Sequence, residues 1–462
     1  MTYFFETYGC EMNIAESAAV ELLLISRGWK KADSAQVAAL AIINTCSIRE
    51  TAENRIIGRL GWYSGLKAVR ECKTGAKTKL LEEAVAYVSN GPKPLTLVVM
   101  GCMAERLLNT FKESYPFVDY VVGTFAKHKF GEIAEAVEEG RTAFKIDENE
   151  EYRFASVSAE PGAFSTFLPI MHGCNNFCTY CIVPYVRGRE LSRPVTEILK
   201  EFDVLAKMKV CEVTLIGQNV NSYHGKDENG NDVNFAGLLS IIAEHLRKTD
   251  SPVKWVRFMS SHPKDFSDDV IDIIAKEKVL CRHIHLPVQH GSTEILKRMN
   301  RRYTREEYLA LVDKIKAKIP DVSLTTDIMM GFPGETEEDV RLTLELMNYV
   351  KYESAMMYYY NPRSGTPAAK MEQLPVEVRK EHLQRVIDLQ LIHTQERMAL
   401  RVGKTVPVLF EGVSRDNKEE LLGQIEQHEK IAVKAPKNLI GHFADVKIES
   451  LNGNTFKGTL VM

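Results

Sequence analysis

Three cysteines lie on one short segment, which runs His172-Gly173-Cys174-Asn175-Asn176-Phe177-Cys178-Thr179-Tyr180-Cys181. Their Cys-x3-Cys-x2-Cys spacing gathers three thiolates, and soft sulfur ligands suit iron–sulfur clusters. A 4Fe–4S cluster held by three thiolates keeps one iron open to a small molecule. The main alternative is a structural zinc site, but zinc favours four protein ligands in paired sets, and no fourth Cys or His follows at a matching spacing. The spacing therefore favours a cluster on Cys174, Cys178 and Cys181.

Three more cysteines each follow a predicted strand. They occur in the sequences Tyr8-Gly9-Cys10, Asn44-Thr45-Cys46 and Met100-Gly101-Cys102. In an open parallel sheet the ends of such strands share one edge, where ligands bind. Three unrelated buried cysteines are the alternative, because buried cysteine is common in protein cores. We favour a second cluster on Cys10, Cys46 and Cys102, and we expect Cys72, Cys211 and Cys281 to be structural or incidental.

Composition and charge limit the possible classes of protein. The chain has 462 residues, of which 45% are hydrophobic and 26% charged, as in globular proteins of several domains. The first residues lack the pattern of a signal peptide, and no apolar run reaches the roughly 20 residues of a membrane span. We therefore expect a cytoplasmic protein without a membrane partner. The net charge of −3 means that nucleic-acid binding would depend on local basic patches.

The periodicity predicts three domains. Residues 1–145 alternate strands (2–7, 38–44, 95–100 and 119–122) with helices such as 13–27, which is typical of a doubly wound α/β fold. Residues 146–165 resemble a linker. Six strands (166–171, 210–217, 255–260, 283–288, 324–331 and 355–360) alternate with helices in a second domain, residues 160–395, and predict a partial (β/α)6 barrel. One of those helices is predicted over 195–208, with Ser192 as its N-cap, and another over 376–400.

The last domain, residues 398–462, has a different pattern. Strands predicted at 405–411, 421–427, 430–434, 443–450 and 455–460 indicate a small antiparallel barrel, a fold often used to hold RNA. A generic all-β appendage is the alternative.

Polar side chains gather at the predicted strand ends of the barrel. Amide, imidazole and carboxylate groups suit the polar groups of a cofactor, although each could instead cap a helix or brace a loop. The predicted cofactor contacts are Gln218, Asn221, His262, Gln289 and Asp327. Two basic runs could meet RNA phosphates, although a basic run is more often only a solvated face. They are Arg187, Arg189 and Arg193, and Lys297, Arg298, Arg301, Arg302 and Arg305.

Taken together, these motifs resemble the methylthiotransferase branch of the radical S-adenosylmethionine enzymes over nearly the whole chain. Within the branch, three local sequences are similar to those of the synthases that methylthiolate N6-dimethylallyladenosine in tRNA. They are Tyr8-Gly9-Cys10-Glu11-Met12-Asn13, the run from Cys174 to Tyr185, and Arg187-Gly188-Arg189-Glu190. Two features depart from the family: His290 stands where a serine is expected, and segment 67–79 looks like a longer surface insertion.

The resemblance implies a transferase with two 4Fe–4S clusters, S-adenosylmethionine and a C-terminal TRAM domain. The cluster on Cys174, Cys178 and Cys181 would cleave S-adenosylmethionine to a 5′-deoxyadenosyl radical, which abstracts hydrogen from C2 of the adenine at position 37. The cluster on Cys10, Cys46 and Cys102 would hold the sulfur that is methylated and transferred. The implied partners are the tRNA anticodon loop, a sulfur donor and an electron-donor protein.

Two other functions are compatible with the same residues. An enzyme of the same class could methylthiolate threonylcarbamoyl-adenosine in tRNA or a ribosomal protein. A chain of another class could be a non-catalytic iron–sulfur protein that binds RNA.

Overall fold

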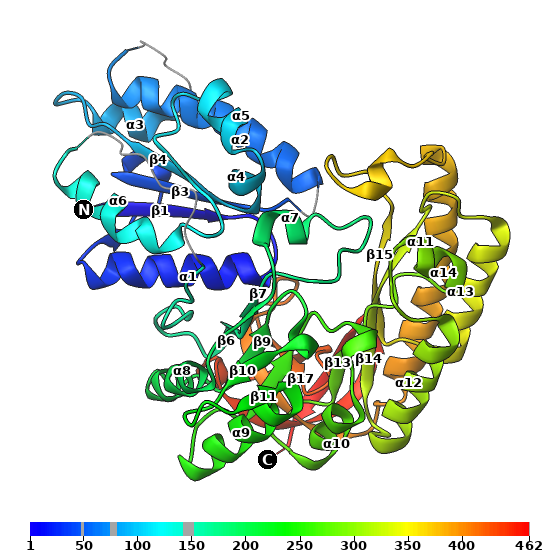
Figure 1. Cartoon of the computed structure of the whole chain (residues 1–462). Helices are drawn as coiled ribbons and strands as arrows, with labels where there is room; N and C mark the ends of the chain where they lie inside the picture. The colour runs from blue at the N-terminus through cyan, green and yellow to red at the C-terminus, as the bar shows by residue number, and fades with distance from the viewer. Residues whose placement is uncertain (48–49, 74–80, 142–151, 462) are drawn as a thin grey trace. The chain divides into compact units, whose positions relative to one another are not determined.

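The structure is a computed structural model that describes residues 1–47, 50–73, 81–141 and 152–461 (Figure 1). The chain forms two compact units, each made of several segments. Unit 1 contains Met1–Pro161, Phe167–His172 and Ile182–Arg189, and unit 2 contains Gly162–Thr166, Gly173–Cys181 and Glu190–Met462. Within the described ranges, a helix with the length and apolarity needed to cross a membrane is not found.

A five-stranded parallel sheet with strand order β2-β1-β3-β4-β5 forms the centre of unit 1. Its strands are β1 (Thr2–Thr7), β2 (Lys30–Lys31), β3 (Leu40–Thr45), β4 (Thr96–Gly101) and β5 (Tyr120–Val122). Every residue of β3 is buried, as expected for a parallel strand covered on both faces.

Helices cover both faces of this sheet. On one face Ile43 packs in a cluster with Leu60 of α2, and on the other Ile42 packs in a cluster with Leu24 of α1. The helices of unit 1 are α1 (Glu11–Ser26), α2 (Glu50–Arg70), α3 (Glu82–Tyr87), α4 (Cys102–Arg106), α5 (Leu108–Ser114), α6 (Phe130–Glu138) and α7 (Val183–Arg187), with 3-10 turns η1 (Ala35–Val37) and η3 (Lys127–Lys129). The predicted doubly wound α/β fold is confirmed.

Segment 67–79 does not behave as a surface insertion where it is described. Lys67 and Arg70 belong to the last turns of α2, and both are buried. Lys67 donates a hydrogen bond of 2.6 Å to Asp119, and Arg70 donates to the carbonyl oxygens of Gln36 and Ala38. The prediction was wrong for these residues, while Cys72 is exposed and residues 74–79 lie outside the described ranges.

Two parallel three-stranded sheets, β12-β9-β6 and β13-β14-β15, form the predicted partial barrel. A parallel bridge between Val256 and Leu280 connects them. The strands are β6 (Ser165–Pro169), β9 (Glu212–Ile216), β12 (Trp255–Phe258), β13 (His283–His285), β14 (Ser323–Met330) and β15 (Ser354–Tyr359). Each strand begins within two residues of its predicted start, and β13 ends three residues earlier than predicted. The agreement arises because these strands are apolar runs bounded by turn residues.

The remaining elements of this part of the chain are helices and short strands. The helices are α8 (Val195–Lys207), α9 (Phe235–Lys248), α10 (Asp268–Lys276), α11 (Thr293–Arg298), α12 (Arg305–Lys318), α13 (Glu337–Val350) and α14 (Val376–Ala399), with 3-10 turns η4 (Val220–Ser222), η5 (Pro263–Asp265) and η6 (Pro367–Lys370). The short strands are β7 (Met171–His172), β8 (Leu191–Ser192), β10 (His224–Lys226) and β11 (Asp232–Asn234).

The predicted N-cap of α8 was wrong. Pro194 occupies the N-cap position and makes no side-chain cap, while Ser192 belongs to β8. The hydroxyl oxygen of Ser192 instead accepts a hydrogen bond of 2.9 Å from the backbone N–H of His224.

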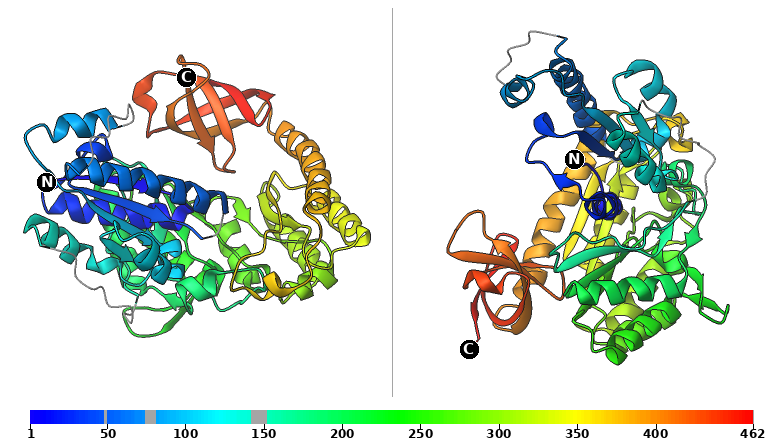
Figure 2. Two further views of the ribbon diagram at one scale, coloured as in Figure 1. Left: turned by 90° about the horizontal axis from the view of Figure 1, so that it is seen from above. Right: turned by 90° about the vertical axis from the view of Figure 1, so that its left-hand side faces the viewer.

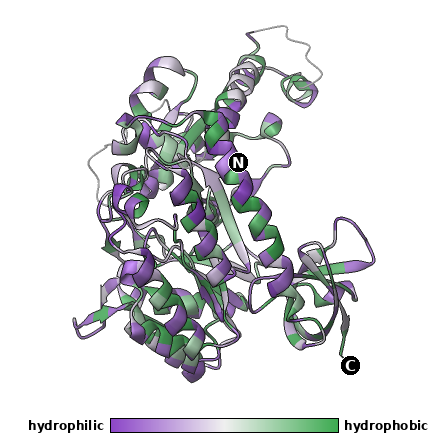
Figure 3. Cartoon of the chain, turned by 90° about the vertical axis from the view of Figure 1, so that its right-hand side faces the viewer, coloured by the Kyte–Doolittle hydropathy of each residue, from purple (hydrophilic) through white to green (hydrophobic). Residues whose placement is uncertain are grey.

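The C-terminal strands close into a barrel in the order β16-β17-β18-β20-β19, which follows α14 in the chain (Figure 2). They are β16 (Thr405–Val413), β17 (Glu420–Ile425), β18 (Lys430–Lys434), β19 (Phe443–Asn452) and β20 (Thr455–Leu460), with the turn η7 (Lys437–Leu439). Hydrophobic and hydrophilic residues alternate along the helices (Figure 3). The predicted antiparallel barrel is confirmed, with one parallel pair, β18 and β20.

Candidate functional site

Cys10, Cys46 and Cys102 follow three neighbouring strands of the sheet in unit 1. Strands β1, β3 and β4 end at Thr7, Thr45 and Gly101, and all three run parallel. A Cβ atom built on Gly9 would lie 2.9 Å from the Cβ of Cys46, so the loop that carries Cys10 passes directly over Cys46. The three cysteines therefore share one edge of the sheet, as the sequence predicted.

Two buried asparagines fix this edge. Asn13, in the first turn of α1, donates hydrogen bonds of 2.8 Å to Asn44 Oδ1 and 2.9 Å to the carbonyl oxygen of Thr45. The Cys10 thiol donates to Asn13 Oδ1 at 3.4 Å. Because both asparagines are fully buried, these bonds lock the loop after β1 to the loop after β3. Sequence reasoning missed them, although Asn13 follows Cys10 by one helical turn.

A buried group of charges lies beside Cys102. Arg187 is 3% exposed, and its Nε donates to Cys102 Sγ at 3.3 Å while its Nη1 donates to Glu16 at 2.8 Å. Lys127 also donates to Glu16, and His172 Nδ1 lies 3.5 Å from Arg187 Nη1. Burial raises the pKa of Glu16, but Arg187 and Lys127 outweigh it and hold that pKa below its usual range. Two cationic groups thus share one carboxylate next to the sulfur of Cys102.

The loop with the second cysteine triad belongs to unit 2 and is held by its neighbours. Gln218 Oε1 accepts a hydrogen bond of 2.5 Å from the backbone N–H of Gly173, and Asn300 Nδ2 donates to the carbonyl oxygen of Phe177 at 3.0 Å. Phe177 has a φ of +47°, a conformation that is rare outside glycine and that these contacts stabilise. Burial raises the pKa of the Cys174 thiol to about 11, so metal binding there has to displace a proton.

An arginine also contacts the triad of Cys174, Cys178 and Cys181, as Arg187 contacts Cys102 in unit 1. Arg301 Nη1 donates to Cys178 Sγ at 3.6 Å, and its Nη2 donates to the carbonyl oxygen of Pro287 at 3.0 Å. Its Nε donates to Tyr303 Oη at 3.1 Å. Arg301 is 8% exposed, so its guanidinium is committed to the protein interior.

The predicted phosphate contacts are therefore corrected at three positions. Arg187 and Arg301 are buried against cysteines, and Arg193 is 1% exposed and pairs with Glu201. A phosphate cannot reach these guanidinium groups. Of the other predicted positions, Arg305 is half-buried, and the remaining four are exposed: Arg189, Lys297, Arg298 and Arg302.

The five predicted cofactor contacts lie on the loops that follow the barrel strands, or on β14 in the case of Asp327. Asn221 is the most informative, because both polar atoms of its buried side chain lack a hydrogen-bond partner among the described residues. A buried amide without partners fits a polar ligand. Gln289 has a φ of +67°, and its backbone pairs with Asp327 and Met329, which fixes the loop after β13 against β14.

His262 and Asp327 already have partners within the protein. The Nδ1 of His262 accepts a hydrogen bond of 3.2 Å from the backbone N–H of Lys264, so this imidazole caps the turn η5. Burial, with Arg301 and Lys264 nearby, lowers the pKa of His262 to about 2 and keeps the ring neutral. Asp327 Oδ1 lies 3.5 Å from His285 Nε2 and is half-buried. A ligand could therefore contact His262 through Nε2 and Asp327 through Oδ2.

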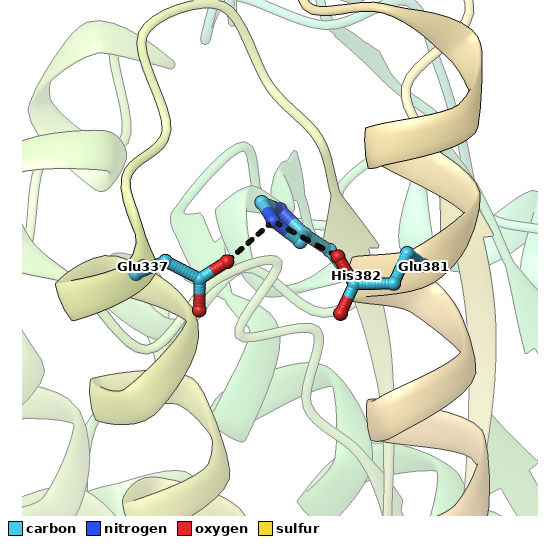
Figure 4. Close-up of side chains that lie close together, drawn as sticks. All are labelled: Glu337, Glu381 and His382. Atoms are coloured by element: carbon cyan, nitrogen blue, oxygen red, sulfur yellow. Dashed lines mark hydrogen bonds and ion pairs between the residues drawn. The ribbon is translucent and has the colours of Figure 1, made fainter.

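His290, which departs from the family pattern, belongs to a buried ion-pair chain. Its Nε2 lies 2.8 Å from Glu335, whose other oxygen lies 2.6 Å from His382 Nδ1. Figure 4 shows His382 between Glu337 and Glu381, a group that could hold a metal ion. Glu337 already pairs with Arg385 at 2.7 Å, however, and both nitrogens of His382 face carboxylates. Ion pairing accounts for this arrangement.

Comparisons with known proteins agree with this architecture. Family models match at residues 2–123 (Uncharacterized protein family UPF0004), 168–347 (Radical SAM superfamily) and 399–461 (TRAM domain). Among solved structures, a radical S-adenosylmethionine methyltransferase, TsrM, from Kitasatospora setae has the same fold, with a TM-score of 0.55 and 16% identity over 80% of this chain and 77% of that chain.

Two relatives are similar along their whole length. A protein of Treponema pallidum is 50% identical over 100% of this chain and 99% of its own, and one of Clostridium tetani is 42% identical over 97% and 93%. Both are named tRNA-2-methylthio-N(6)-dimethylallyladenosine synthase. With both cysteine triads in place on the expected strand ends, the chain belongs to the family of tRNA-2-methylthio-N(6)-dimethylallyladenosine synthases.

Proposed function

We propose that this chain transfers a methylthio group to C2 of N6-dimethylallyladenosine at position 37 of tRNA. The observation that carries the proposal is the full-length similarity to synthases of this name, at up to 50% identity. The side-chain arrangement supports it, because two triads of thiols lie at strand ends in separate parallel sheets. No contact of the described residues favours threonylcarbamoyl-adenosine, a ribosomal protein or a non-catalytic role over this reaction.

The loop from Gly173 to Cys181 is the proposed site of the radical chemistry. A 4Fe–4S cluster on Cys174, Cys178 and Cys181 would supply the electron and the open iron for reductive cleavage of S-adenosylmethionine. Asn221, Gln289 and Asp327 would orient the polar groups of that molecule, since they lie on the same rim. Arg301 would place a fixed positive charge on the thiolate of Cys178, and Gln218 and His262 would position the surrounding loops.

The edge of the sheet in unit 1 is the proposed site of sulfur attachment. A second 4Fe–4S cluster on Cys10, Cys46 and Cys102 would hold the sulfur to be methylated. Arg187 and Lys127 both pair with Glu16, so two positive charges face one carboxylate and favour a further anion at Cys102, as a thiolate ligand would provide. The reaction would draw on a sulfur donor and an electron-donor protein.

The proposed RNA contacts lie at exposed cations and on the C-terminal barrel. Arg189, Lys297, Arg298 and Arg302 would bind phosphates of the anticodon loop. We assign residues 1–145 to the auxiliary-cluster domain, 160–395 to the radical domain and 398–462 to the RNA-binding domain.

Deletion of the gene is expected to remove one modified nucleoside from tRNA. The 2-methylthio form of N6-dimethylallyladenosine should disappear, and the unmethylthiolated prenylated form should accumulate, when tRNA digests are measured by mass spectrometry. A matched digest should keep 2-methylthio-threonylcarbamoyl-adenosine at its normal level. If the 2-methylthio prenylated nucleoside persists in the deletion strain, the proposed function is wrong.

The substitution Gly101→Ala should remove only the second cluster. Gly101 has a φ of +97°, and a Cβ there would lie 2.5 Å from the carbonyl oxygen of Thr45. Cys102, the next residue, would move, so iron content should fall from about eight to about four per chain. Gly28→Ala is the matched control, because Gly28 has a φ of +83° but no atom within 4 Å of a built Cβ. Equal iron losses in both variants would argue against this assignment.

A further inference from the structure

One face of the sheet β13-β14-β15 carries exposed apolar side chains. In the parallel register of β14 and β15, Asp327 pairs with Met356 and Met329 pairs with Tyr358. Paired residues of neighbouring strands point to the same side of a sheet. Met329, Met356 and Tyr358 therefore form one continuous patch, which we call the apolar strip, next to the carboxylate of Asp327.

Two of the three side chains in the apolar strip are exposed to solvent. Met356 is 46% exposed and Tyr358 is 40% exposed, and both lie on β15, the edge strand of the sheet β13-β14-β15. Tyr358 Oη donates to Met356 Sδ at 3.6 Å, so the two side chains lie together. Adjacent apolar side chains that a fold leaves uncovered mark a surface for a partner or ligand more often than isolated ones do.

The apolar strip is continuous with the loop of the radical triad. Met329 packs on a buried cluster that contains Ile295 and Phe332, and the same cluster takes in Tyr180. Tyr180 stands between Cys178 and Cys181 in the sequence and contacts Phe332 edge-on, with ring centroids 6.5 Å apart. A group bound on the apolar strip would thus lie beside the loop where the radical chemistry is proposed.

We propose that the apolar strip binds the dimethylallyl group of the substrate adenosine, an inference that rests on the proposed function. The dimethylallyl group is a branched five-carbon alkene without polar atoms. Methionine suits such a ligand because its thioether is flexible and polarisable, and the tyrosine ring offers a flat apolar face.

The same surface discriminates against the other modified adenosine. A threonylcarbamoyl group carries a carboxylate, which the apolar strip cannot solvate. Asp327, in register with Met356, adds repulsion between like charges. The strip is therefore a specificity-determining site for prenylated over threonylcarbamoylated tRNA.

Binding of two RNAs tests the inference. The full-length protein with reconstituted clusters and S-adenosylmethionine is titrated with anticodon stem-loops that carry either dimethylallyladenosine or plain adenosine at position 37. We expect the wild type to prefer the prenylated RNA, and Met356→Gln or Tyr358→Ala to reduce that preference about tenfold. Affinity for the plain RNA should change little.

The controls separate this inference from the proposed function. Leu391→Ala, which alters an exposed apolar residue on α14, should keep the preference of the wild type. An unchanged preference in both strip variants, or an equal loss of affinity for both RNAs, would overturn the inference. Product analysis of the wild type with the prenylated RNA is the separate arm: absence of methylthiolation there would reject the proposed function, whatever the strip variants do.

Discussion

Replacing Glu212 by alanine is expected to lower the free energy of unfolding of unit 2 by about 3–5 kcal/mol. Glu212 is 1% exposed and receives hydrogen bonds of 2.6 Å from Arg257 Nε, 2.6 Å from Gln424 Nε2 and 2.8 Å from Ser165 Oγ. Its removal takes away the carboxylate that pairs with the buried guanidinium of Arg257.

The loss should appear as faster amide exchange in β9, β12 and β17 of the reconstituted protein, measured by hydrogen-exchange mass spectrometry. Glu338→Ala is the matched control, because Glu338 pairs with Arg341 in solvent and its loss should leave exchange unchanged. The double variant Glu212→Met with Arg257→Met should recover much of the loss, since it removes both charges. Unchanged exchange in the single variant would contradict the argument.

This cluster also fixes the C-terminal barrel on the radical domain. Arg257 Nη2 donates to the carbonyl oxygen of Ile425 at 3.1 Å, and Trp255 meets Phe443 edge-on with centroids 4.7 Å apart. Glu212 is the first residue of β9 and Trp255 is the first residue of β12. The loop from Gly173 to Cys181 and Asn221 instead follow the C-terminal ends of strands, at the opposite edge of the sheet. A five-residue strand is about 16 Å long, so a tRNA bound by the barrel would have to extend past the sheet to reach the proposed radical site. Loss of the Glu212 cluster should therefore weaken tRNA binding as well.

The fold was largely predictable from the sequence because its strands are short apolar runs between turn residues. Strand β3 is buried on both faces and shows the unbroken hydrophobic run of a parallel sheet. The positions of Cys10, Cys46 and Cys102 followed from strand ends alone. Segment 67–79 misled the prediction because Lys67 and Arg70 suggest solvent by type, yet both donate to buried oxygens.

The site was less predictable where charge is buried. A run of arginines in a sequence does not show which side chains turn inward, since that depends on partners far along the chain. Arg187 meets Glu16, which precedes it by 171 residues, and Arg301 meets Cys178. Asn221 was predicted as a ligand contact by residue type, and its two unpartnered atoms support that role.

Replacing Arg187 by methionine is expected to destabilise unit 1 by about 3 kcal/mol and to weaken the proposed second cluster. Methionine keeps much of the volume but removes the charge 3.3 Å from Cys102 Sγ and the donors to Glu16. Because Lys127 still pairs with Glu16 in the variant, the expected loss of stability is at the low end of the range for breaking a buried ion pair. Cys10 should also lose a stabilising charge, because Arg187 opposes the burial that raises the pKa of its thiol.

Iron content and reduction potential measure the effect of this substitution. A nearby cation stabilises the reduced, more negative form of a cluster, so its loss should shift the potential of the second cluster to more negative values in an electron paramagnetic resonance titration. The potential of the proposed cluster on Cys174, Cys178 and Cys181 is read in the same titration and should not move. Arg187→Lys should keep part of the effect, since it retains the charge but not the planar fork.

Arg189→Met is the matched control for Arg187→Met. Arg189 lies two residues further along and is exposed, so its loss should leave both potentials and the iron content at wild-type values. Because Arg189 is a proposed phosphate contact, its replacement should instead weaken tRNA binding and flatten the salt dependence of that binding. An Arg187→Met protein with an unshifted second potential would show that the guanidinium only fills space beside Cys102. A shift in Arg189→Met as well would mean that general surface charge, rather than the buried contact, sets the potential.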